Sequence, residues 1–315
     1  MKLQIKFNSF LVIVLAIFGF NQAVFGENVY YNIAHMLSTK KLIDWGISQG
    51  ANAVEADLHF VNGVPAKFSH GPGLCECTFT GIAKATANIP LIKDITKRLY
   101  PPVCQASSDP CGVSENATDW FNHLATKSNV ALLIIDTKTG SIKDNEMATA
   151  GKNVIKMINQ ELFNRGFKGT VIVGVPEFNG LPYLRAAAQE ASSSAYKDRT
   201  FFAVDQESDA LKTIKELASF TKNRAYGVGL PSFVPIKFFS AISLASRNEK
   251  AGVIGFTYIW TIDDRDIMKK YIETGARGIM TDDPKALFEV YKQLGKTLAK
   301  PSDALPIGQS DTVVK

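Results

Sequence analysis

The chain has 315 residues, 46% of them hydrophobic, and a formal net charge of +5. This length accommodates one (β/α)₈ barrel of about 250 residues with room for an insertion, whereas two such barrels would be crowded. The mildly basic charge is compatible with a lipid surface. It does not indicate nucleic acid, where clustered Lys and Arg would be expected, so we expect no nucleic-acid partner.

Residues 1–26 have the pattern of a secretory signal peptide. Lys2 and Lys6 precede an uncharged apolar run, Phe10–Phe20, and small residues follow at positions compatible with cleavage. The run is too short for a comfortable membrane span, which favours cleavage over an uncleaved anchor. We therefore expect a secreted, extracellular protein whose mature chain begins near Glu27.

After this segment, short β-rich apolar runs alternate with helical patterns. Strands are expected, in chain order, at Val29–His35, Ala53–Phe60, Ala66–His70, Val130–Asp136, Thr170–Val175, Thr200–Val204, Ala225–Leu230, Val253–Trp260 and Gly278–Thr281. Helices are expected at Lys41–Gln49, Asn145–Phe163, Leu181–Glu190, Asp209–Phe220, Phe238–Asn248, Asp264–Thr274 and Pro284–Leu294.

This alternation predicts an α/β fold with a parallel sheet covered on both faces. The number of major strands is that of a closed barrel, so we expect a single (β/α)₈ TIM barrel over residues 27–300. An open doubly wound sheet is the alternative. No G-x-G-x-x-G follows the first strand, which removes the main sign of a dinucleotide-binding fold.

One interval, Gly71–Asn129, breaks this rhythm with frequent Pro and a poor helical pattern, and indicates a long βα loop. It holds all four cysteines, Cys75, Cys77, Cys104 and Cys111. In an exported chain two disulfides are expected to staple this loop. The pairing stays open, although a bond between the near-adjacent Cys75 and Cys77 is disfavoured. Zinc is the alternative, but the spacing is not a standard zinc pattern.

Two further segments carry predictions. Asn116 begins an Asn-Ala-Thr glycosylation sequon, which indicates exposed surface and, in a secreted chain, a glycoprotein. The polar, Pro-containing residues 301–315 lack any periodic pattern and are expected to be an irregular or mobile tail.

Polar side chains stand near the predicted strand ends, where the chemistry of such barrels occurs. Glu55 and Asp57 are two residues apart, so their side chains leave the same face of a strand. Asp136 ends the neighbouring strand and can bring a third carboxylate to the same point. Such crowding needs a cation, and oxygen-only ligands suit Mg²⁺ or Ca²⁺. Because Mg²⁺ also takes phosphate oxygens, we expect one Mg²⁺ in a phosphoester site.

Histidines accompany these carboxylates. His35 ends the first predicted strand and His70 follows the second, and an imidazole pair can act as acid and base at neutral pH. His59 lies on the face of Glu55 and Asp57; a metal-ligand role is conceivable, but a supporting or packing role is favoured. His123 is interpreted as a helix or loop residue.

Three more residues are candidates for substrate contact. Lys138 could neutralise a phosphate oxygen, with an exposed loop lysine as the alternative. Tyr258 and Trp260 share one face of a strand and are expected to point into the barrel mouth. Aromatic faces there could hold a quaternary ammonium, although core packing is the alternative.

These residues together resemble the sphingomyelinase D/phospholipase D toxins of arachnids, relatives of the glycerophosphodiester phosphodiesterases. The matching motifs are AHM at Ala34–Met36, VEAD at Val54–Asp57, SHG followed by CEC at Ser69–Cys77, IDTKTG at Ile135–Gly140, YIWTID at Tyr258–Asp263 and GIMTDDP at Gly278–Pro284. Each motif is short, but the ordered set is specific.

The resemblance implies a TIM barrel, a Mg²⁺ ion held by Glu55, Asp57 and Asp136, and substrate contacts from Lys138 and Trp260. It further implies release of choline from sphingomyelin or lysophosphatidylcholine by attack of the lipid's own hydroxyl, which gives a cyclic phosphate. By analogy, His35 would deprotonate that hydroxyl and His70 would protonate the leaving choline. The expected partners are choline phospholipids at membrane surfaces, met by a monomeric enzyme.

The chain also departs from the family pattern. It has no cysteine after Cys111, the stretch from Cys77 to Cys111 is long, and Asp282 stands where Asn is common. One alternative is a glycerophosphodiester phosphodiesterase, although Met36 replaces the Arg that follows the first His in that family. The other is a catalytically inactive secreted lipid-binding protein, although such a protein need not keep the full histidine and carboxylate set.

Overall fold

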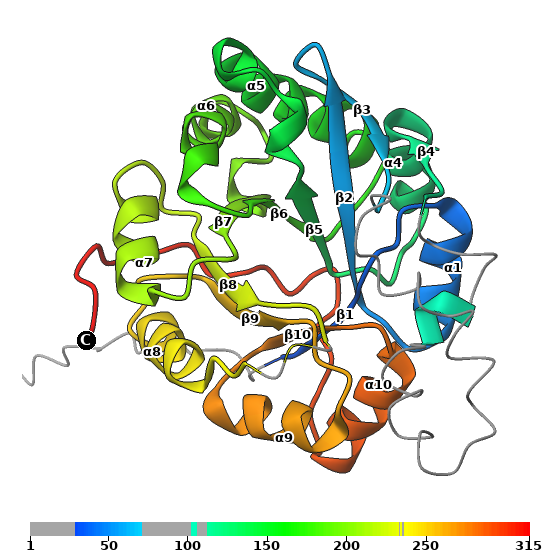
Figure 1. Ribbon diagram of the computed structural model, residues 1–315, viewed down its shortest axis with the longest axis vertical. Helices are drawn as coiled ribbons and strands as arrows, with labels where there is room; N and C mark the ends of the chain where they lie inside the picture. The colour runs from blue at the N-terminus through cyan, green and yellow to red at the C-terminus, as the bar shows by residue number, and fades with distance from the viewer. Residues whose placement is uncertain (1–28, 71–101, 106–111, 233, 235) are drawn as a thin grey trace, which may run out of the picture.

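The computed structural model describes residues 29–70, 102–105, 112–232, 234 and 236–315, and in this part of the chain it shows a ring of strands inside a ring of helices (Figure 1). The barrel strands are β1 (Tyr31–Ala34), β2 (Ala53–Val61), β5 (Leu132–Thr137), β6 (Thr170–Val175), β7 (Thr200–Val204), β8 (Ala225–Gly229), β9 (Phe256–Trp260) and β10 (Gly278–Thr281). The outer helices are α1 (Lys40–Ser48), α4 (Ala117–Ala125), α5 (Met147–Ile158), α6 (Leu181–Ser192), α7 (Ala210–Ala218), α8 (Phe239–Lys250), α9 (Arg265–Thr274) and α10 (Pro284–Gln293).

The barrel strands form a parallel sheet in the order β7-β6-β5-β2-β1-β10-β9-β8. The two ends of this order meet near the amino end of β8, where Phe202 of β7 bridges Arg224 and its N–H donates to the carbonyl of Asn223 at 3.0 Å. This nearly closed arrangement confirms the predicted (β/α)₈ barrel over the open-sheet alternative. It also places the carboxyl ends of all these strands around one mouth.

Side-chain alternation explains the two layers of the core. Along β5, Leu132 and Ile134 pack inside the barrel with Ile33 and Phe256, whereas Leu133 belongs to the layer between strands and helices. The helices present apolar residues at helical spacing to that outer layer. The same alternation points Asp136 inward, two residues beyond Ile134.

The second strand, predicted at Ala53–Phe60, extends to Val61 and turns back as a hairpin. The short strand predicted at Ala66–His70 is present as β3 (Val64–Phe68), and it pairs antiparallel with the outer half of β2. Asn62 and Gly63 connect them with φ of 51° and 71°, values that a two-residue Asn-Gly turn adopts readily. Glu55 and Asp57 therefore lie within β2 rather than at its end.

Part of the predicted long loop is a helix. α4 occupies Ala117–Ala125, inside the interval expected to be irregular, and it buries Trp120, Phe121 and Leu124. Asn116 is exposed, and its side chain accepts hydrogen bonds from the first turn of this helix. The helix α4 was not predicted because the Pro and Cys residues that precede it dominate the pattern of this interval. Before α4, a two-residue strand β4 (Glu115–Asn116) pairs with β3.

Several predictions fall on residues that the structure does not describe. These are the signal peptide at 1–26 and the disulfide staple, since the side chains of Cys75, Cys77, Cys104 and Cys111 are outside the described part. Within the residues that are described, no helix has both the length and the apolar character needed to cross a membrane.

Residues 301–315 contain no helix or strand, yet they are bonded to the amino end of the barrel. The guanidinium of Arg224 donates to the carboxylate of Asp311, and Asn248 exchanges two hydrogen bonds with the backbone of Val314. Leu305 is buried beneath the barrel core. The tail thus covers the end of the barrel opposite the mouth.

Candidate active site

A cavity of about 220 Å³ opens at the carboxyl ends of the barrel strands. Its wall is formed by His35, Glu55, Asp57, His70, Asp136, Lys138, Asp205, Gln206, Leu230, Pro231, Trp260, Thr261 and Met280. Seven of the eight candidates selected from the sequence are in this set, and Tyr258 is the exception.

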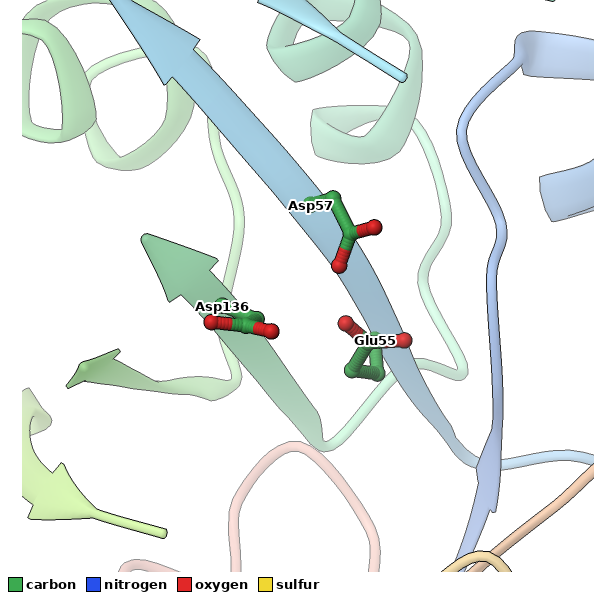
Figure 2. Close-up of side chains that lie close together, drawn as sticks. All are labelled: Glu55, Asp57 and Asp136. Carbon is green, nitrogen blue, oxygen red and sulfur yellow. The ribbon is translucent and has the colours of Figure 1, made fainter. Parts of the chain in front are cut away.

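Three carboxylates form the floor of the cavity. Figure 2 shows Glu55 and Asp57 on β2 facing Asp136 on β5, and one oxygen from each lies within 4.8 Å of the others. The register of the parallel strands causes this, because Asp57 is the direct neighbour of Asp136. Glu55 and Asp57 are each only 2% exposed, which makes an uncompensated pair of charges costly.

Lys138 brings a positive charge next to two of these three carboxylates. Its ammonium nitrogen lies 2.5 Å from Oδ2 of Asp136 and 3.0 Å from Oδ1 of Asp57. The backbone holds the lysine here, since its N–H donates to the carbonyl of Leu58 on β2 at 3.0 Å. Lys138 is therefore a half-buried, paired residue at the end of β5.

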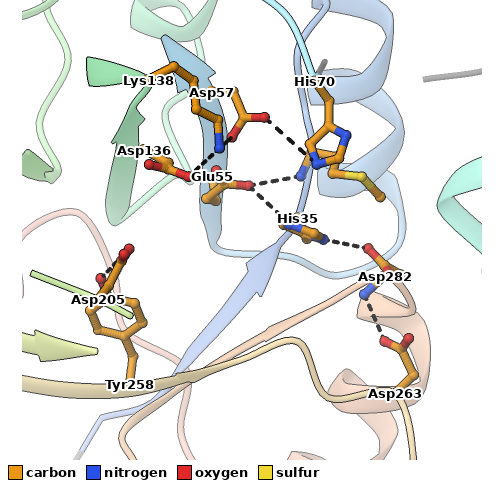
Figure 3. A network of polar contacts seen from close by, with 11 residues as sticks. His35, Glu55, Asp57, His70, Asp136, Lys138, Asp205, Tyr258, Asp263 and Asp282 are labelled. Carbon is orange, nitrogen blue, oxygen red and sulfur yellow. Dashed lines mark hydrogen bonds and ion pairs between the residues drawn. The ribbon is translucent and has the colours of Figure 1, made fainter. Parts of the chain in front are cut away.

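The two histidines face each other above the carboxylates (Figure 3), with ring centroids 5.7 Å apart. Nδ1 of His35 lies 2.8 Å from Oδ1 of Asp282, while its Nε2 faces Glu55 at 3.9 Å. Nε2 of His70 is 3.7 Å from Oδ2 of Asp57. Each imidazole thus has a carboxylate partner, and both rings border the same cavity.

The surroundings shift the protonation of these groups in opposite directions. Burial, helped by the charges of Asp57 and Asp136, raises the pKa of Glu55 well above its usual range. Burial also opposes ionisation of Asp57, but the Lys138 ammonium and His70 outweigh it and hold the Asp57 pKa below its usual range. Burial disfavours the ammonium of Lys138, yet Asp136 and Asp57 outweigh that effect and raise its pKa.

The two aromatic candidates lie in different places, Trp260 at the cavity and Tyr258 in the core. Trp260 lines the cavity, and its indole N–H donates to the backbone carbonyl of Asp205 at 2.9 Å. Tyr258 is fully buried, and its hydroxyl lies 3.2 Å from Oδ2 of Asp205. Burial and the charge of Asp136 raise the pKa of Asp205 well above its usual range.

Two acidic residues of the site were not selected from the sequence. Asp205 follows β7 directly, which is the kind of signal that drew attention to Asp136, and Gln206 and Glu207 come directly after it, but it was not selected. Asp282 was noted only because it stands where Asn is common in the related toxins, and the fold brings it to His35. His59, in contrast, lies outside the cavity wall, and its Nε2 is 2.7 Å from the carbonyl of Ser69 on the hairpin.

The floor residues have the chemistry of a divalent-cation site. Oδ2 of Asp57 and Oδ1 of Asp136 are buried and accept no hydrogen bond from any residue that the structure describes. Buried carboxylate oxygens without donors are expensive, and a hard cation satisfies them. Glu55, Asp57 and Asp136 therefore fit a divalent cation bound through oxygen.

The two histidines and three acidic groups at the mouth of this (β/α)₈ barrel are the kinds of group that acid–base catalysis beside a divalent cation uses. The dermonecrotic toxin SPH family model matches residues 26–99 and 113–299, and the chain belongs to that family. This confirms the resemblance to arachnid sphingomyelinase D/phospholipase D toxins and, with it, a phosphodiesterase.

Individual relatives agree with this assignment. A dermonecrotic toxin of Loxosceles laeta is 25% identical over 280 residues, covering 84% of this chain and 90% of the toxin. One of Loxosceles similis is 22% identical over 272 residues, covering 83% and 89%.

Solved structures support the fold. A putative glycerophosphoryl diester phosphodiesterase from Silicibacter pomeroyi gives a TM-score of 0.59 at 12% identity, covering 86% of this chain and 96% of its own. A glycerophosphodiester phosphodiesterase from Parabacteroides distasonis gives 0.52 at 13% identity, covering 86% and 100%.

Proposed function

We propose that this protein is a secreted, Mg²⁺-dependent phospholipase D that releases choline from sphingomyelin and lysophosphatidylcholine and forms a cyclic phosphate. The observation that carries the proposal is the pair of imidazoles, 5.7 Å apart, directly above three acidic groups in one cavity. His35 and His70 border the cavity next to the three carboxylates. A base, an acid and a cation beside the phosphate are the groups that phosphodiester cleavage uses.

The size of the cavity indicates which part of a lipid enters it. A volume of about 220 Å³ suits a phosphate and a small head group but not acyl chains. The lipid tails would then remain at the membrane surface. We propose that the protein works there as a monomer on choline phospholipids, with the cysteine-rich interval closed by two disulfides.

The proposed reaction begins with His35. The contact between its Nδ1 and Asp282 leaves Nε2 on the cavity side, where it can take the proton of the lipid hydroxyl. That hydroxyl oxygen forms a bond to phosphorus while the bond from phosphorus to the choline oxygen breaks. His70 gives its proton to the departing choline oxygen, so one proton is taken and one is returned.

The remaining residues hold the substrate. Glu55, Asp57 and Asp136 would bind one Mg²⁺, which when bound supplies positive charge to the phosphate oxygens. Lys138 would add a second positive charge to the phosphate. The indole face of Trp260, held by the bond from its N–H to the carbonyl of Asp205, suits the quaternary ammonium of choline by cation–π attraction.

The test is phosphorus NMR of the mature protein with sphingomyelin, lysophosphatidylcholine and glycerophosphocholine, with Mg²⁺ or with EDTA. We expect cyclic phosphate and choline from the first two lipids in Mg²⁺ alone. Preference for glycerophosphocholine would instead identify a glycerophosphodiesterase. No turnover of any substrate, with vesicle binding intact, would identify an inactive lipid-binding protein.

Histidine variants sharpen the test. His35→Ala and His70→Ala should each lower turnover by about 10² to 10⁴-fold, the range of general acid–base catalysis. His123→Ala is the matched control, since His123 pairs with Asp44 on the outer helices, away from the cavity. Equal activity of all three variants would refute the assigned roles.

A further inference from the structure

Lys138 occupies an unusual place for a residue expected to contact substrate. Its ammonium is directed at two of the three carboxylates that form the cation site, at 2.5 Å from Asp136 and 3.0 Å from Asp57 (Figure 3). Among the residues that the structure describes, no other lysine or arginine forms an ion pair with Glu55, Asp57 or Asp136. Lys138 therefore provides the fixed positive charge of this cluster.

The lysine is held in this position by its backbone. Its N–H continues the ladder from β5 to β2 by donating to Leu58, and its carbonyl accepts hydrogen bonds from both the N–H and the hydroxyl of Ser141. The side chain therefore starts from an anchored point beside Asp57. At 34% exposure it also borders the cavity, so the ammonium has space to move toward a ligand.

A divalent cation in this site would bind the same carboxylates that the Lys138 ammonium contacts. A cation held by oxygens at about 2.0 to 2.6 Å would lie within a few ångströms of a nitrogen that is bonded to Asp57 and Asp136. Two positive charges at that separation repel in a buried site far more than in water. Binding of one therefore weakens the hold on the other.

We propose that Lys138 is the resident cation of the carboxylate cluster, that it competes with the divalent ion for Asp57 and Asp136, and that ion binding releases its ammonium toward the substrate phosphate. Before the ion binds, the lysine keeps the crowded carboxylates in place. Ion binding then makes the lysine available for phosphate, so the order of binding is ion first and lipid second. The inference rests on the cation site of the proposed function.

The first test measures ion affinity without substrate, by titrating Mn²⁺ into the mature protein and following free Mn²⁺ by electron paramagnetic resonance. Lys138→Met should bind Mn²⁺ at least tenfold more tightly than the wild type, whereas Lys138→Arg, which keeps the charge, should remain close to it. Lys143→Met is the matched control, because Lys143 is 73% exposed and pairs with Glu146.

The outcomes separate the two proposals. Equal or weaker Mn²⁺ binding by Lys138→Met, with normal binding by the wild type, would overturn the competition and leave the cation site intact. Absence of Mn²⁺ binding in both proteins would overturn the cation site and the competition together.

The second test is thermal unfolding in EDTA and in saturating Mn²⁺. In EDTA, Lys138→Met should unfold about 3 °C or more below the wild type, because the carboxylates lose their fixed counter-charge. In Mn²⁺ the difference should vanish or reverse, since the ion then supplies that charge and binds the variant more tightly. An equal loss in both conditions would show only a packing role and would refute the proposal.

Discussion

At the amino ends of the strands one buried and one half-buried arginine each lie against one carboxylate, whereas at the carboxyl ends three acidic groups gather near one lysine. Arg277 pairs with Glu249, and Arg224 pairs with Asp311 of the tail. At the mouth, Lys138 pairs with both Asp57 and Asp136, and Glu55 is the third carboxylate of the cluster. In a one-to-one pair the two charges compensate each other, while an excess of buried carboxylates is stable only with added protons or cations. One end of the barrel is thus built for stability and the other for binding.

The largest expected effect is a loss of activity at the cation site of the mouth, with no loss of fold stability. Glu55→Gln should lower choline release by at least about 10³-fold, because the cation site loses a charged ligand. Its unfolding temperature should be equal or higher, since burial and the charges of Asp57 and Asp136 already raise the pKa of Glu55 and make its ionised form costly in the folded protein. Phosphorus NMR and calorimetry measure the two effects. A loss of stability together with the loss of activity would mean that the carboxylates of the mouth stabilise the fold, as the ion pairs at the opposite end do.

The reverse result is expected for Arg277→Met. It leaves the buried Glu249 without its partner and should cost about 3 to 5 kcal/mol of unfolding free energy, with turnover per folded molecule unchanged. Arg185→Met is the control, because its pair with Glu216 is exposed and worth at most about 1 kcal/mol. Denaturant unfolding measures both, and equal losses would contradict the contrast between buried and exposed pairs.

The pH dependence of that variant follows from Glu249. Burial outweighs Arg277 and raises the pKa of Glu249, so the folded protein binds this proton more tightly than the unfolded chain does. Its contribution to stability therefore falls as the pH rises through the folded pKa. The deficit of Arg277→Met should shrink at low pH, where a protonated Glu249 needs no cation. A deficit that is constant with pH would contradict this cause.

A smaller effect is expected at the choline side of the cavity. Trp260→Leu should raise the KM for sphingomyelin about tenfold, the equivalent of 1 to 2 kcal/mol of cation–π attraction. A ceramide phosphoethanolamine substrate, which lacks the three methyl groups, serves as the control and should lose less. The same loss on both lipids would assign Trp260 to general packing rather than to recognition of the quaternary ammonium.

The smallest effect is expected in the tail. Asp311→Ala should cost about 1 kcal/mol, since Asp311 is 68% exposed and Arg224 keeps its hydrogen bonds to three backbone carbonyls. Urea unfolding measures the change. A loss as large as that of Arg277→Met would mean that the tail contributes to the stability of the barrel as strongly as the buried Glu249 pair.

Much of the fold was predictable because its signals are local. The Val, Leu and Ile run of β5 and the long helical pattern of α5 are short-range periodicities that survive in the structure. The β2–β3 hairpin was missed although Asn62-Gly63 is a strong turn signal, and α4 was missed because Pro and Cys around it dominate the pattern. Tyr258 was assigned to the mouth because spacing gives the face of a strand but not the depth along it.

The sequence by itself determined the alternation of strands and helices, the inward face shared by Glu55 and Asp57, and the positions of the histidines, because these depend on neighbours along the chain. Only the tertiary structure decided that Asp136 stands beside Asp57, that Asp282 reaches His35 across 247 residues, and that Lys138 turns back onto the carboxylates. Those contacts arise from barrel closure and strand register, which bring distant residues together and are not encoded in any local pattern.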